Sequence, residues 1–308
     1  MKNVYQHVQR AGLDTAAMTL VGFAAGCGIA RLGSGATPRS QHFIDTPEFA
    51  IWSAVVGFEI ALRLNLFSAL WIIRAEIRSR VGVGCVWTSF VAILIVAGIF
   101  RIAEFIYPTI HSGLHGNGLR RMLLHLSMLI TLAPGLVSLW RIRWWISRAH
   151  VADTLERPDS PQAGQLISDV LYFNRTLQKI LLMISAVVVV SIVDVAAFRI
   201  AYLAQAPKTS VFPVGLVVLY GLLLTVVLSF LYLPVYSGFN EYKRQLRDAL
   251  CPVPAVGVPD EAWHGNRDRT ERLLQLPRGP WESLRTNYAV LTPLIASVFS
   301  LFLPGIRF

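Results

Sequence analysis

The stretch LLMISAVVVVSIVDVAAFRIAYL, at residues 181–203, decides the fold because it is almost entirely apolar. Its only charged side chains are Asp194 and Arg199. At a rise of about 1.5 Å per residue, about 20 residues cross a hydrocarbon core of about 30 Å as an α-helix. A helix also pairs its own backbone N–H and C=O groups, which lipid cannot do. The stretch therefore predicts a transmembrane helix.

The composition of the whole chain indicates a membrane protein. Of the 308 residues, 54% are apolar and 15% are charged, against about 45–50% and about 25% in an average soluble domain. The mean hydropathy is +0.54. The chain is too apolar to be disordered, and its three cysteines are too few for a disulfide scaffold. A soluble basic nucleic-acid binder would not carry such long apolar blocks, so we place the net charge of +10 in the loops of a polytopic membrane protein.

Working outward from residues 181–203, six apolar blocks predict helical spans. They lie at about 13–30, 49–73, 81–107, 122–145, 177–203 and 211–236. The predicted fold class is therefore all-α, a polytopic membrane helical bundle of about six transmembrane helices. The bundle occupies residues 1–237 and includes cytoplasmic helical arms at 147–178.

Residues 238–308 predict a small helical cytoplasmic C-terminal region. The last span continues as an amphipathic helix, which ends at Cys251-Pro252, and a second polar helix begins near Asp260. The final apolar stretch, 288–303, is interrupted by Pro293 and is shorter than a span. We expect it to be an interfacial or re-entrant helix, although the charges leave a seventh span open.

The Lys and Arg residues predict the orientation. Most of the 28 fall on one side of the six blocks if the N-terminus is cytoplasmic, as the positive-inside rule requires. We expect a multi-pass protein of the bacterial inner (plasma) membrane with both termini in the cytoplasm.

Charged residues inside the blocks are the best candidates for function, because a charge at membrane depth is costly and usually faces protein or water. They are Glu59, Arg63, Arg101, Glu104, Asp194 and Arg199. One interpretation is a polar, water-filled path, and the other is that neighbouring charges neutralise each other and fix the helix register. Asp194 is the sharpest candidate, because no basic residue lies three or four positions away. Arg101 and Arg199 can also reach the outer interface.

Three further groups of residues carry expectations. Gly22, Gly26 and Gly57 lie in small-residue ridges that allow close helix contact, within the chain or between chains. A one-sided basic patch predicts contact with anionic lipid or with an anionic cytosolic ligand such as a nucleotide or oligonucleotide; its members are Arg74, Arg78, Arg80, Arg141, Arg143 and Arg148. Lys243, Arg244 and Arg247 in the tail are candidates for gating. No stable nucleic-acid-binding domain is evident.

No catalytic motif is present, so we predict neither an enzyme nor a bound cofactor or metal, while a membrane-embedded enzyme stays open. We expect a homo-oligomeric gated ion channel or pore-forming inner-membrane effector, controlled from the cytoplasm. Its general layout is similar to the membrane effectors of bacterial stress and antiphage defence systems, where a soluble cue opens a pore. The alternatives are a small-solute or lipid transporter, and a membrane sensor or scaffold subunit.

Overall fold

The computed structural model describes residues 2–32, 36–82, 117–148, 161–205, 212–253, 259–277, 279 and 288–300. Within these ranges the chain is helical and contains no strand, which confirms the predicted all-α class. The elements are α1 (Lys2–Ala30), α2 (Pro38–Ile44), α3 (Pro47–Val81), α5 (Asn117–Arg148), α7 (Pro161–Gln205), α8 (Gly215–Leu250), α9 (Glu261–Leu273), the 3-10 turn η2 (Tyr288–Val290) and α11 (Thr292–Phe299).

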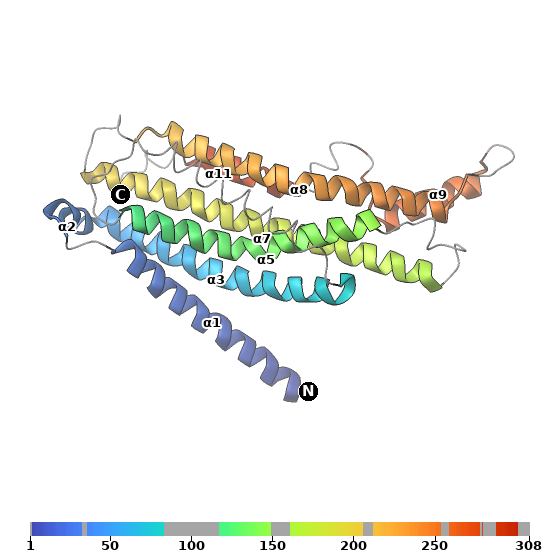
Figure 1. Ribbon diagram of the computed structural model, residues 1–308, viewed down its shortest axis with the longest axis horizontal. Coiled ribbons are helices and arrows are strands. Elements are labelled where there is room, and N and C mark those ends of the chain that lie inside the picture. The colour runs from blue at the N-terminus through green and yellow to red at the C-terminus, as the bar shows by residue number, and fades with distance from the viewer. Residues whose placement is uncertain are drawn as a thin grey trace.

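The long helices α3, α5, α7 and α8 lie side by side as an elongated bundle, and α1 diverges from it (Figure 1). These four helices are long and apolar enough to cross a membrane, which supports a membrane protein. We call the end where α3 and α5 begin the α2 end, and the opposite end the α9 end.

The predicted number of six spans is wrong for the residues that the structure describes, which contain four. In the first predicted block, the described side chains of α1 cover the apolar helix Asp14–Ala30, which is shorter than the 18 residues of a candidate span, and the side chains before Asp14 lie outside the described part. The predicted span at 81–107 lies almost wholly outside the described residues. The other four blocks fall inside α3, α5, α7 and α8.

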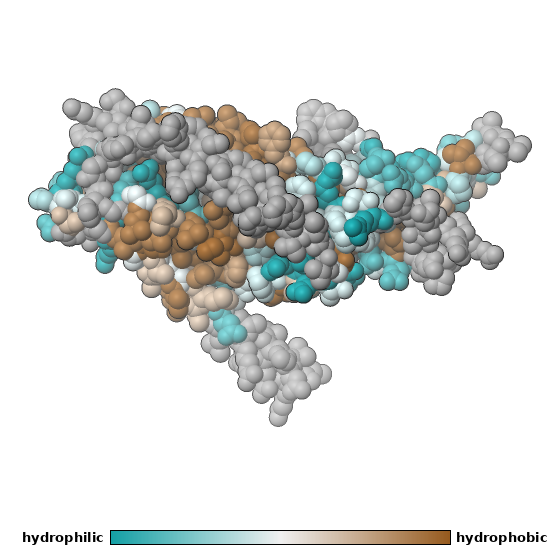
Figure 2. All heavy atoms as spheres, viewed as in Figure 1, coloured by the Kyte–Doolittle hydropathy of each residue, from teal (hydrophilic) through white to brown (hydrophobic). Residues whose placement is uncertain are grey.

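The spanning helices are longer than a bilayer requires. The 45 residues of α7 correspond to about 68 Å, more than twice the thickness of about 30 Å of a hydrocarbon core. The helical arm predicted at 165–179 and the following span are therefore one continuous helix, and α8 likewise runs unbroken to Leu250. Figure 2 shows a hydrophobic surface towards the α2 end and a mainly hydrophilic one towards the α9 end.

The tail returns along the bundle. Asp260 caps α9, since its carboxylate accepts a hydrogen bond from Trp263 N at 2.8 Å. Farther on, Ser185 of α7 donates a hydrogen bond to Ala289 O, and Ser297 of α11 packs against Gly221 of α8. The short apolar helix α11 thus lies beside the spanning parts of α7 and α8 (Figure 1).

The glycine ridges bring α1 and α3 together within the chain. A Cβ at position 22 would lie 2.6 Å from the Cα of Ala61, and one at position 26 would lie 2.7 Å from the Cα of Gly57. Gly57 in turn accommodates the ring of Phe23. These glycines lie deep in the contact, where a larger side chain would not fit, so the two helix backbones touch.

We expect Gly26→Ala to destabilise the protein by about 1–3 kcal/mol, the usual cost of overpacking. The new Cβ would lie 2.5 Å from Val56 O, which cannot move away without shifting α3. Unfolding of the purified protein in detergent measures the change. Gly28→Ala is the matched control on the same helix, because a Cβ there meets nothing within 4 Å. Equal stabilities of the two variants would contradict this contact.

Candidate functional site

The candidate site lies where α3, α5 and α7 meet, about halfway through the apolar part of the bundle. Glu59 and Arg63 are four residues apart on α3 and therefore share a face. Glu59 is about 18 Å from the start of its helix, and Asp194 is about 16 Å from the end of the antiparallel α7. The structure thus brings these three predicted residues to one depth.

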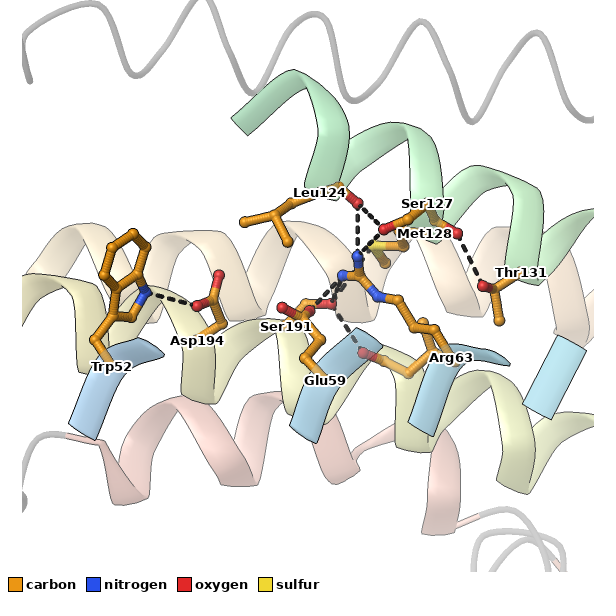
Figure 3. A network of polar contacts seen from close by, with 10 residues as sticks. Trp52, Glu59, Arg63, Leu124, Ser127, Met128, Thr131, Ser191 and Asp194 are labelled. Atoms are coloured by element: carbon orange, nitrogen blue, oxygen red, sulfur yellow. Dashed lines mark hydrogen bonds and ion pairs between the residues drawn. The ribbon is translucent and has the colours of Figure 1, made fainter. Parts of the chain in front are cut away.

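Arg63 is the centre of the site. Its guanidinium is only 3% exposed and forms an ion pair with Glu59, which is 1% exposed. It also donates to Ser191 Oγ at 2.9 Å, to Leu124 O at 2.6 Å and to Ser127 Oγ. Figure 3 shows these contacts converging from α3, α5 and α7. A buried arginine is tolerable only with such compensation, because an unpaired charge away from water is costly.

The partner of Asp194 is a tryptophan rather than a basic residue. The indole Nε1 of Trp52, on α3, donates a hydrogen bond to Asp194 Oδ1 at 2.8 Å (Figure 3). Asp194 is 8% exposed, and its carboxylate and that of Glu59 repel each other as like charges, while Arg63 attracts both. The site therefore holds two carboxylates around one central guanidinium.

These groups line a cavity of about 80 Å³, large enough for several water molecules. Its walls come from α3, α5, α7, α8 and the residues before α8; the lining residues are Trp52, Glu59, Arg63, Asn117, Arg120, Arg121, Leu124, His125, Ser191, Asp194, Val195, Phe198, Phe212 and Tyr220. Two buried atoms of the ion pair, Glu59 Oε2 and Arg63 Nε, form no hydrogen bond to the part of the chain that the structure describes.

The cavity extends towards the α2 end and stops towards the α9 end. Asn117 and Arg120, in the first turn of α5, line its outer part. About 10 Å beyond the ion pair, Leu70 and Ile184 close around Gly135, where a Cβ would lie 3.2 Å from Leu70 and 3.5 Å from Ile184. We call these three residues the apolar layer. A chamber lined by charged residues thus lies next to an apolar layer inside the same bundle.

Of the remaining predicted intramembrane residues, Arg199 is described and does not line the chamber. Arg199 donates to Phe212 O at 2.9 Å, so it holds α7 to the segment before α8. Arg101 and Glu104 lie outside the described residues.

The predicted basic patch divides into two sets. Arg80 binds Asp169 at 2.9 Å, Arg143 donates to Pro234 O at 2.7 Å, and Arg148 stacks on Trp144 at 4.2 Å. The other set consists of Arg74, Arg78 and Arg141, which lie close enough together to interact as like charges.

The three predicted tail residues differ in their surroundings. Lys243 is 1% exposed and donates to Gln275 O at 3.2 Å, next to Asn174. Arg247 binds Glu271 of α9 at 2.8 Å. Arg244 is exposed, 3.7 Å from Glu241. Lys243 and Arg247 therefore hold the polar helix α9 and its last turn against α7 and α8.

Sequence reasoning missed Trp52, Ser191 and Arg120 as members of the site. Trp52 lies seven residues before Glu59 and Ser191 three before Asp194, so helical periodicity could have placed both on the polar faces. Arg120 precedes the predicted span at 122–145, and the structure buries its side chain, which donates to Leu32 O at 2.7 Å. The inward orientation of Arg120 depends on tertiary contacts, so the local sequence does not indicate it.

The ion pair can be tested by a double-mutant cycle. Arg63→Gln leaves Glu59 buried without its partner and should cost about 3–5 kcal/mol of stability. The double variant Glu59→Gln/Arg63→Gln removes both charges and should be more stable than Arg63→Gln alone. Denaturant unfolding in detergent measures each free energy. Strict additivity of the two single changes would argue against a coupled pair.

Comparison with known proteins does not indicate a function, so the interpretation rests on the chemistry of the site. No protein family model, curated protein or solved structure matches the chain. Among the described residues, no group of three or more His, Cys, Asp or Glu side chains is arranged to hold a metal ion. The charged, water-sized chamber at membrane depth is therefore the strongest candidate for a functional site.

Proposed function

We propose that this protein is a gated ion-conducting membrane protein whose path passes through the chamber beside Glu59, Arg63 and Asp194. One observation carries the proposal: two carboxylates and an arginine surround a water-sized cavity at membrane depth. Intramembrane charges are rare and are typical of ion and proton pathways. A purely structural pair would need no cavity and no second carboxylate.

The apolar layer supports the gated part of the proposal. Hydrophobic constrictions close channels by excluding water, and Leu70 and Ile184 form such a constriction around Gly135. Gly135 follows Pro134, which lacks the N–H that a helix interior uses. The helix α5 can therefore bend at the level of the constriction more easily than an uninterrupted helix.

The proposed path lies inside one chain. The path does not have to run along the symmetry axis of an oligomer, so the homo-oligomer expected from the sequence stays a prediction. The same holds for the bacterial inner membrane, the cytoplasmic termini, and the role as a stress or antiphage effector.

A small-solute transporter is the second candidate, because the chamber is closed at one end as an occluded binding site would be. The two functions differ in kinetics. A channel passes ions down their gradient at a rate that the opened constriction sets, whereas a transporter takes up one solute and saturates. Flux into proteoliposomes loaded with different salts and solutes separates them.

We expect Leu70→Ala to open the apolar layer and raise the resting ion conductance of proteoliposomes. In that background, Asp194→Asn and Glu59→Gln should each reduce conductance by about tenfold, because each removes a charge from a low-dielectric path. Glu241→Gln is the control, since it removes an exposed carboxylate of α8 that lies away from the chamber.

Thermal unfolding of each variant has to accompany the flux assay, because Leu70→Ala leaves a cavity that costs about 2–5 kcal/mol. If folded Leu70→Ala and wild-type protein both pass no ions, the channel proposal fails. It also fails if conductance is the same with and without the two carboxylates.

A further inference from the structure

A second cluster of charged residues lies towards the α9 end, away from the chamber. Arg74 and Arg78 are four residues apart on α3 and so share a face. Arg141, on the neighbouring parallel helix α5, is 6% exposed and experiences both as like charges. We call these residues the arginine cluster.

Within the described part of the chain, the arginine cluster has no carboxylate partner. The two acids nearest to it in α3 and α7 are already engaged, because Glu76 accepts from the Tyr172 hydroxyl at 2.8 Å and Asp169 binds Arg80. Three positive charges held together without an anion repel one another. Another negative group would relieve that repulsion.

Several donors of the arginine cluster are also left without an acceptor. Arg74 Nε and Arg141 Nη1 are buried and form no hydrogen bond to the part of the chain that the structure describes. Buried polar groups almost always have partners, so a set of orphaned donors indicates a missing acceptor. These donors come from two helices, so one ligand could satisfy both.

The chemistry of the cluster matches a phosphate group. Guanidinium groups present planar pairs of N–H donors that fit phosphate oxygens. Arg80 and Arg143 of the predicted patch have acceptors, and Arg148 stacks on Trp144. Arg74 also stacks on Trp71 at 4.6 Å, and Trp71 is half exposed. Tryptophan and arginine together are typical of the headgroup level of a bilayer.

We propose that Arg74, Arg78 and Arg141 form a phosphate-binding site that bridges α3 and α5. The phosphate belongs either to the headgroup of an anionic phospholipid or to a free phosphate compound in solution. Because the ligand contacts both helices, binding stabilises this end of the bundle whether or not the protein conducts ions.

The experiment follows the unfolding temperature of the purified full-length protein in a neutral detergent, by tryptophan fluorescence. One arm adds short-chain phosphatidylglycerol, with phosphatidylcholine of the same chain length as the neutral control. The other arm adds pyrophosphate at constant ionic strength. We expect one of the anionic probes to raise the unfolding temperature in a saturable way.

Arg78→Gln and Arg141→Gln should each raise the probe concentration needed for half-maximal stabilisation by about fivefold. This is the usual effect of one basic residue on the binding of an anionic headgroup. Arg244→Gln is the matched control, because it removes an exposed arginine outside the cluster. Arg78 is itself exposed, so its variant tests the site even if Arg141→Gln does not fold.

The outcomes separate the sources. Stabilisation by phosphatidylglycerol alone assigns the site to a lipid headgroup, and stabilisation by pyrophosphate assigns it to a free phosphate compound. The proposal is overturned if neither probe stabilises the protein, or if Arg244→Gln weakens binding as much as Arg78→Gln. Conductance plays no part in this readout, so failure here leaves the proposed channel function untouched.

Discussion

The charge of Arg63 at membrane depth is the constraint on which the arrangement of the bundle depends. A guanidinium removed from water needs a counter-charge and acceptors for its N–H groups. Glu59 provides the charge from the same helix, while Leu124 O and Ser191 Oγ provide acceptors from α5 and α7. Since these partners come from three helices, the compensation of one side chain fixes the register of all three.

The compensation of Arg63 leaves some buried polar atoms of the site without hydrogen bonds to the described residues. Among the described residues, Glu59 Oε2 and Arg63 Nε have no hydrogen-bond partner, and Asp194 adds a second carboxylate that accepts a hydrogen bond from an indole. A bundle selected for stability alone would be expected to fill such a space with apolar side chains. The contrast between the polar chamber and the apolar layer around Gly135 is what makes conduction the most economical interpretation.

Towards the α9 end, the structure separates charges that are already compensated from those that are not. Arg80 and Arg247 have carboxylate partners, and Lys243 is buried against carbonyl and amide oxygens. The arginine cluster has no such partners among the described residues. Counting basic residues along the chain cannot make this distinction, because a partner is defined by distance in space.

The sequence by itself determined the class of fold, the positions of four spanning helices and the residues that carry charge into the membrane. Hydropathy over about 20 residues and helical spacing are local properties, so they can be read before any contact is known. The span count differs because the side chains of the first block are described only from Asp14 onward and the block at 81–107 lies almost wholly outside the described residues.

Only the tertiary structure decided that Asp194 pairs with Trp52, that Arg120 turns inward, and that Arg74 and Arg141 bury donors with no acceptor among the described residues. Each of these facts depends on residues far apart in the chain. Their proximity follows from how the helices align, and that alignment is fixed by the balance of buried charges and close backbone contacts rather than by any local pattern.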